Sequence, residues 1–129
     1  MIKDIYQWLE TAGQEPSEPK VSLAIKLIEE ELQELKDAWA KGVEFLDAVV
    51  DLYWVVTNAP YFAGEPIESV QEYVEKVSLS NWSKFCTSKT VADLTVIAYQ
   101  EGTHPSKLGE KIDCYAEQVR ELWVVKRRD

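Results

Sequence analysis

Two long segments with helical spacing of apolar residues, joined by the two-residue link Lys41-Gly42, constrain the fold of this chain most strongly. The first segment covers residues 21–40. Its apolar residues recur at steps of four, three and four, at Ile28, Leu32, Leu35 and Trp39. The second segment, from about residue 44 to 58, is apolar on nearly every side. A link this short predicts two antiparallel helices, and the apolar surface predicts that the second helix is the most buried element.

The rest of the chain predicts further short elements around this pair. Gly13, Pro16 and Pro19 indicate a loop over residues 13–20. Helices are expected over residues 2–12, 67–84 and 110–119, and from Thr90, where Asp93 completes a variant of the capping box. Residues 122–125 favour a lone terminal strand. The predicted fold is all-α: a four-helix-bundle core with an extra C-terminal helix and a short terminal β segment, in a single domain over residues 1–129.

Composition excludes several classes of function. The chain of 129 residues has a net charge of −9, which argues against a partner such as nucleic acid or an anionic membrane. Two cysteines and a single histidine cannot form a zinc finger. The N-terminus has no apolar signal core, and no segment reaches the length of a membrane span. We therefore expect a cytoplasmic protein.

Two carboxylates interrupt the apolar helix. Asp47 and Asp51 are four residues apart and share one helix face, with no Lys or Arg in their helix to pair with them. A buried, unpaired carboxylate would cost several kcal/mol or would take up a proton. On the preceding helix, Glu31 and Glu34 lie toward the apolar stripe, so antiparallel packing would let the two pairs converge. Clustered carboxylates suit a hard divalent ion such as Mg²⁺, with Mn²⁺ as a substitute.

Other interpretations of these acids remain open. A Glu-rich helix surface is most often simply solvated. A lysine from another segment, such as Lys26 or Lys84, would make Asp47 and Asp51 part of a structural ion pair. Glu44 precedes Asp47 by three residues and is an alternative metal ligand.

The order of these motifs resembles a known family. Glu30-Glu31-x-x-Glu34, a short gap and then Asp47-x-x-x-Asp51-Leu52 is similar to the all-α nucleoside triphosphate pyrophosphohydrolases of the MazG-like superfamily, closest to their small phage-type members. The segment Ser80-Asn81-Trp82-Ser83-Lys84 resembles the Ser-Asn-Met-Ser-Lys motif of that branch. The stretch 98–105 and the ending 123–127 are also similar to it, so the resemblance covers most of the chain.

The resemblance implies a role for each matching residue. Glu31, Glu34, Asp47 and Asp51 would ligate the metal ion. Glu30 or Glu34 would accept the proton of the attacking water. Lys84 would contact phosphate, and Asn81 would contact sugar or phosphate. A tryptophan would stack on the base. The candidates are Trp8, Trp39, Trp54 and Trp82, although burial in the core is the commoner role of each.

The expected function is Mg²⁺-dependent hydrolysis of a (deoxy)nucleoside triphosphate to monophosphate and pyrophosphate, in control of nucleotide pools. Two alternatives remain: dUTP-type or phosphoribosyl-ATP-type hydrolysis on the same fold, and a non-catalytic helical interaction module. The helix that is apolar all round predicts burial against another subunit, and the resemblance agrees. We expect a homodimer or homotetramer that binds a nucleoside triphosphate, with no nucleic-acid or membrane partner.

Overall fold

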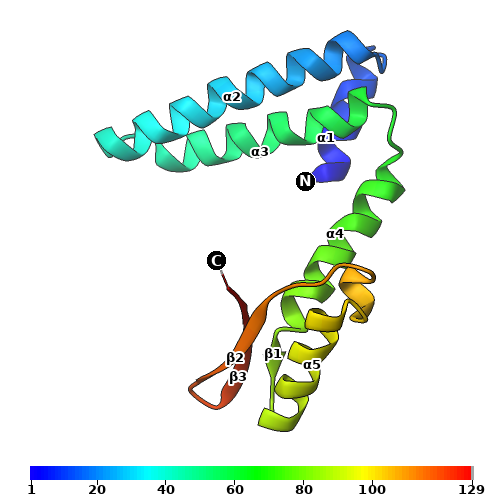
Figure 1. Ribbon diagram of the computed structural model, residues 1–129. Helices are drawn as coiled ribbons and strands as arrows, with labels where there is room; N and C mark the ends of the chain where they lie inside the picture. Colours follow the sequence, from blue (N-terminus) through cyan, green and yellow to red (C-terminus); the bar gives the residue numbers. More distant parts are fainter. Residues whose placement is uncertain (129) are drawn as a thin grey trace. The chain divides into compact units, whose positions relative to one another are not determined.

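The computed structural model describes residues 1–128 and is mostly helical, with a small three-stranded sheet near the C-terminal end (Figure 1). The chain divides into two compact units. Unit 1 covers Met1–Gln71, and unit 2 begins at Glu72. Each unit has its own hydrophobic core.

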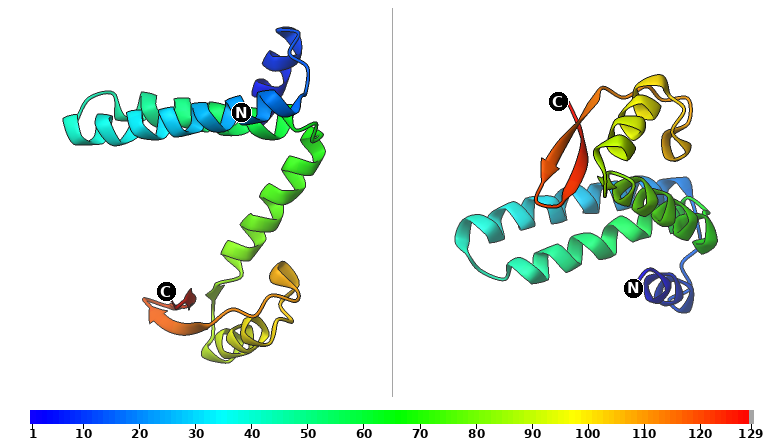
Figure 2. Two further views of the ribbon diagram at one scale, coloured as in Figure 1. Left: turned by 45° about the horizontal axis from the view of Figure 1, so that its top comes forward. Right: turned by 90° about the horizontal axis from the view of Figure 1, so that it is seen from below.

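Unit 1 is built around an antiparallel pair of long helices, α2 (Glu18–Lys41) and α3 (Phe45–Phe62), which lie side by side in Figures 1 and 2. The predicted hairpin is therefore confirmed. The helix α2 starts earlier than expected, because the Ser17 side chain caps it by accepting a hydrogen bond from the Lys20 backbone N–H, and Pro19 fits the first turn. Gly42 ends α2 in the left-handed conformation, with φ of 69°.

The core of unit 1 lies where α1 (Ile2–Thr11) packs against the C-terminal part of α3. Ile5, Tyr6 and Leu9 of α1 are buried there with Tyr61 of α3. The rings of Tyr6 and Tyr61 meet edge to face, with centroids 5.2 Å apart. Because Tyr61 is held in this core and its hydroxyl donates to the Gln14 carbonyl, α3 continues through Pro60 instead of ending before it.

The prediction that the second long helix is the most buried element is wrong for the single chain. Only Ala48, Thr57 and Tyr61 of α3 are buried. Leu46 is 75% exposed, and Val50 and Tyr53 are also exposed. The helices α1 and α2 cover only part of the surface of α3. A four-helix core remains a prediction.

Unit 2 contains most of α4 (Ile67–Trp82), together with β1 (Phe85–Cys86), α5 (Lys89–Glu101), a 3₁₀ turn η1 (Pro105–Lys107), β2 (Cys114–Val119) and β3 (Leu122–Arg127). The strands form an antiparallel sheet in the order β1-β3-β2. The helix α5 packs on this sheet and buries Ala92 and Tyr99 against Cys86, Cys114 and Val125.

Two predictions for the C-terminal region were wrong. Residues 110–119 were expected to be helical, but residues 114–119 form β2, and 122–125 belong to a paired strand and not a lone one. Pairing between residues 114–119 and 122–127 supplies hydrogen bonds that outweigh local helical preference. The expected helix at Thr90 does form, but its cap is Ser88, which accepts from the Val91 backbone N–H.

Candidate metal centre

Three of the predicted metal ligands meet in unit 1. Glu31 and Glu34 lie one turn apart on α2, and Asp51 lies on the neighbouring α3. Each offers one carboxylate oxygen, and these three oxygens all lie within 4.8 Å of one another. The antiparallel packing of α2 and α3 therefore brings Asp51 close to two glutamates that lie 17 and 20 residues earlier in the chain.

Glu31 is the most constrained member of this acidic cluster (Glu31, Glu34 and Asp51). Its Oε2 atom is buried and has no hydrogen-bond partner among the described residues. Burial raises the pKa of the Glu31 carboxyl above its usual value. The negative charges of Glu34, Asp51 and Glu30 raise this pKa further. The neighbouring negative charges therefore disfavour the ionised form of Glu31.

The other proposed acidic residues lie outside the cluster. Asp47 belongs to the first turn of α3 and is exposed, so the structure does not bring all four predicted ligands together. Glu44 is the N-cap of α3, in the left-handed conformation with φ of 52°. Glu30 is exposed beside Glu31. No ion pair described for residues 1–128 involves Asp47 or Asp51, so pairing with Lys26 or Lys84 is not seen in that part of the chain.

The acids are also more exposed than the predicted burial of the second long helix implies. Glu34, Asp47 and Asp51 are exposed, and Glu31 is only half-buried. The cluster nevertheless fits a divalent cation. Its donors are all carboxylate oxygens, and one of them is buried without a partner. Oxygen donors are the ligands that Mg²⁺ prefers, and Mg²⁺ usually keeps waters when only a few carboxylates bind it.

The three residues that were predicted to bind substrate lie in different units. Asn81 and Lys84 lie at and just beyond the end of α4, in unit 2, where both line a cavity. Trp8 lies in unit 1 and is 55% exposed, with its ring edge to face with Trp54 at a centroid distance of 5.9 Å. The core role favoured for the tryptophans is wrong for Trp8, Trp39 and Trp82, which are exposed, whereas Trp54 does pack against the core.

Several polar residues of the unit 2 cavity were not identified from the sequence. They are Lys76, Tyr99, Ser106, Lys107 and Arg127. They come from two helices, a loop and a strand, so no local spacing relates them. The only available signal was charge: residues 1–71 carry 14 acidic and five basic residues, whereas residues 72–129 carry nine of each.

Comparisons with protein-family models, with curated proteins and with solved structures found no match to this chain. Within residues 1–128, no helix combines the length and the apolar character that crossing a membrane requires.

Proposed function

We propose that this protein is a Mg²⁺-dependent nucleoside triphosphate pyrophosphohydrolase that acts in control of cytoplasmic nucleotide pools. One observation carries the proposal: Glu31, Glu34 and Asp51 converge from two helices, and one Glu31 oxygen is buried without a partner. The motif order that resembles the MazG-like superfamily includes all three residues. Repulsion among the acids gives the site a physical reason to take up a cation.

Glu31, Glu34 and Asp51 would hold the ion, with Mn²⁺ as a substitute for Mg²⁺. When bound, the ion would neutralise phosphate oxygens that these acids would otherwise repel. In the reaction, a water oxygen bonds to the α-phosphorus, the bond from that phosphorus to the bridging oxygen breaks, and pyrophosphate leaves. Glu30 or Glu34 would accept the proton released by the water. The assignment of Asn81, Lys84 and Trp8 to substrate binding remains a prediction.

The active form is proposed to be a homodimer or homotetramer. The outward surface of α3 exposes Leu46, Val49, Val50, Tyr53 and Val56. Exposed apolar surfaces of this kind are typical of interfaces. A second α2–α3 hairpin laid against this surface would bury it and would make the four-helix core from two chains.

Product analysis tests the proposed function. The protein is incubated with Mg²⁺ and each common NTP and dNTP, and the products are separated by anion exchange. We expect monophosphate plus pyrophosphate, and we expect the activity to be lost in Glu31→Gln and Asp51→Asn but retained in Glu29→Gln. Glu29 is an exposed residue of the same helix outside the cluster, so it is a matched control.

The same assay, with phosphoribosyl-ATP added to the set of substrates, separates the alternatives. Hydrolysis of dUTP alone, or of phosphoribosyl-ATP alone, would reassign the substrate. Diphosphate plus phosphate as products would contradict the proposed bond cleavage. No turnover of any triphosphate, together with no response to Mg²⁺, would favour a non-catalytic interaction module.

A further inference from the structure

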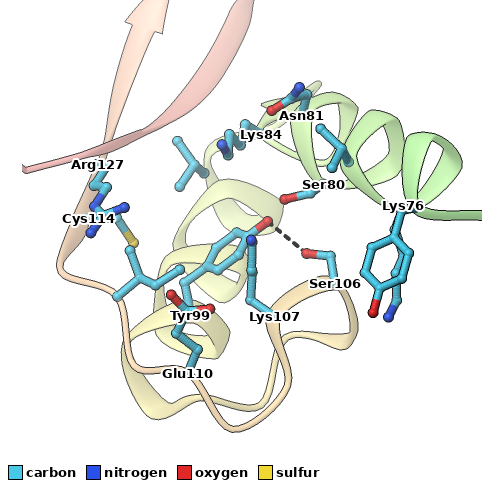
Figure 3. A pocket seen from close by; sticks show the side chains of 14 residues that line it. Lys76, Ser80, Asn81, Lys84, Tyr99, Ser106, Lys107, Glu110, Cys114 and Arg127 are labelled. Atoms are coloured by element: carbon cyan, nitrogen blue, oxygen red, sulfur yellow. Dashed lines mark hydrogen bonds between the residues drawn. The ribbon is translucent and has the colours of Figure 1, made fainter. Parts of the chain in front are cut away.

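Unit 2 contains a cavity of about 370 Å³, a size typical of small-molecule sites. Its walls come from α4, α5, the loop around η1 and the two long strands (Figure 3). All the net negative charge of the chain falls in residues 1–71, and residues 72–129 are neutral overall. The cavity therefore belongs to the part of the chain that repels anions least.

The charged residues of this cavity are mostly basic. Lys76, Lys84, Lys107 and Arg127 line it, with Glu110 as the one acidic lining residue. None of these four cations takes part in an ion pair described for residues 1–128. Lys76 instead lies over the exposed ring of Tyr73, 5.1 Å from its centroid. Four cations around one cavity repel one another, and an anion bound between them would relieve that repulsion.

Hydroxyl groups of Ser80, Tyr99 and Ser106 also line the cavity. The Tyr99 side chain is buried, and its hydroxyl is 3.2 Å from Ser106 Oγ and 3.0 Å from Ser83 Oγ. In Figure 3 the side chains of Ser80 and Ser106 point toward this hydroxyl. Hydrogen bonds with serine hydroxyls and the charge of Lys84 outweigh the effect of burial and lower the pKa of Tyr99.

The loop that carries Ser106 and Lys107 is held in place locally. His104 stacks flat on Tyr99, with ring centroids 4.0 Å apart, and its Nδ1 accepts a hydrogen bond from the Ser106 backbone N–H. Because Nδ1 is already an acceptor and burial lowers the pKa of His104, the imidazole stays neutral. The position of the Ser106 hydroxyl and of the backbone that carries Lys107 is therefore set before any ligand arrives.

We propose that this cavity binds a phosphate or diphosphate group of a small molecule directly, without a metal ion. Lysine and arginine provide charge for phosphate oxygens, and the Ser80 hydroxyl and the Asn81 amide, which line the same cavity, provide hydrogen-bond donors. The excess of three positive charges suits a multiply charged anion. Asn81 and Lys84 line the same cavity, so this ligand would contact the residues that the family resemblance assigns to substrate. The proposal rests on unit 2 alone and does not depend on metal binding by unit 1.

Isothermal titration of the full-length protein in EDTA tests this proposal. Inorganic pyrophosphate is one probe and a nucleoside monophosphate is the other, so the two sources of the group are distinguished. We expect at least one probe to bind, and we expect added KCl to weaken the binding. Lys107→Gln should weaken it by about tenfold, whereas Lys111→Gln should change it by less than about twofold. Lys111 lies four residues away, outside the cavity lining, and serves as the matched control.

Two results would overturn the proposal. One is the absence of binding of either probe in EDTA. The other is equal weakening by Lys107→Gln and Lys111→Gln. Both lysines are exposed, so neither substitution is expected to disturb folding, and circular dichroism of each variant checks this. If neither probe binds, the proposal of Mg²⁺-dependent hydrolysis still stands or falls on the product analysis. If no hydrolysis is found, the proposal of metal-free phosphate binding still stands or falls on this titration.

Discussion

Replacing Glu31 by glutamine should stabilise the metal-free protein while removing its response to metal. The ionised Glu31 faces the like charges of Glu34 and Asp51, and one of its oxygens is buried without a partner. Glutamine has nearly the same shape and no charge. Its amide group can also donate hydrogen bonds to the two remaining carboxylates.

The separation of the carboxylates sets the size of this effect. At 4.8 Å, the upper limit of the oxygen separations, two unit charges repel by about 0.9 kcal/mol in bulk water and by about 3.5 kcal/mol at an effective dielectric constant of 20. Glu34 and Asp51 are exposed to solvent, so the smaller figure applies to each pair. Removing both repulsions should raise the free energy of unfolding by about 1–2 kcal/mol at low ionic strength.

Urea unfolding followed by circular dichroism measures this difference, at one fixed protein concentration and with EDTA present. Because the pKa of Glu31 is raised in the folded state, ionisation of Glu31 destabilises that state as pH rises through the folded pKa. The advantage of glutamine should therefore be present near pH 7 and should disappear well below the ordinary glutamate pKa of 4.5, where Glu31 is protonated in both states.

Mg²⁺ should make the wild type more stable to unfolding than the Glu31→Gln variant, which reverses their order in EDTA. At 100 times its dissociation constant, a ligand that binds only the folded state adds about 2.7 kcal/mol. The wild type should show such a gain and Glu31→Gln should not. Glu29→Gln should match the wild type within about 0.5 kcal/mol. The electrostatic reasoning would be refuted if Glu31→Gln were less stable than the wild type in EDTA near pH 7.

Three further predictions concern other parts of the chain. Leu46→Asp places a charge on the exposed surface of α3 and should convert an oligomer into monomers in analytical ultracentrifugation; an unchanged mass would contradict the proposed interface. Ser88→Ala should cost about 1 kcal/mol of stability through loss of a helix cap, whereas Thr90→Ala, at the cap position expected from sequence, should cost clearly less in the same unfolding assay. Burial lowers the pKa of His104 in the folded state, so the stability that the neutral imidazole contributes is present above the unfolded pKa near 6.5 and is lost as pH falls through the folded pKa. His104→Asn should make the free energy of unfolding less dependent on pH in this range, and an unchanged dependence would argue against this role.

The long hairpin of unit 1 was predictable because its signals are local. The apolar period of residues 21–40 and the short Lys41-Gly42 link depend only on neighbouring residues, and the structure confirms the antiparallel pair. The convergence of Glu31, Glu34 and Asp51 followed from the same pattern. The sequence places Asp47 on the same face as Asp51, but the offset between two packed helices depends on how their side chains interlock. That offset brings only Asp51 to the glutamates.

The C-terminal region was not predictable in the same way. Residues 110–119 have no strong strand pattern of their own, and β2 forms because it pairs with β3. The two-residue strand Phe85–Cys86 is too short to recognise without its partner. Lys76, Lys107 and Arg127 meet around one cavity only after α4, the η1 loop and β3 have packed. Contacts between distant residues decide these features, and periodicity carries no information about them.

Titration with Mn²⁺, followed by electron paramagnetic resonance of the free ion, tests most directly whether acids of two helices share a divalent cation. The wild type should bind the ion. Asp51→Asn should weaken the binding by about tenfold or more, whereas Asp47→Asn, one turn earlier on the same helix, should weaken it by less than about threefold. The account would be contradicted if the wild type bound no Mn²⁺, or if the Asp51→Asn variant bound it as tightly as the wild type.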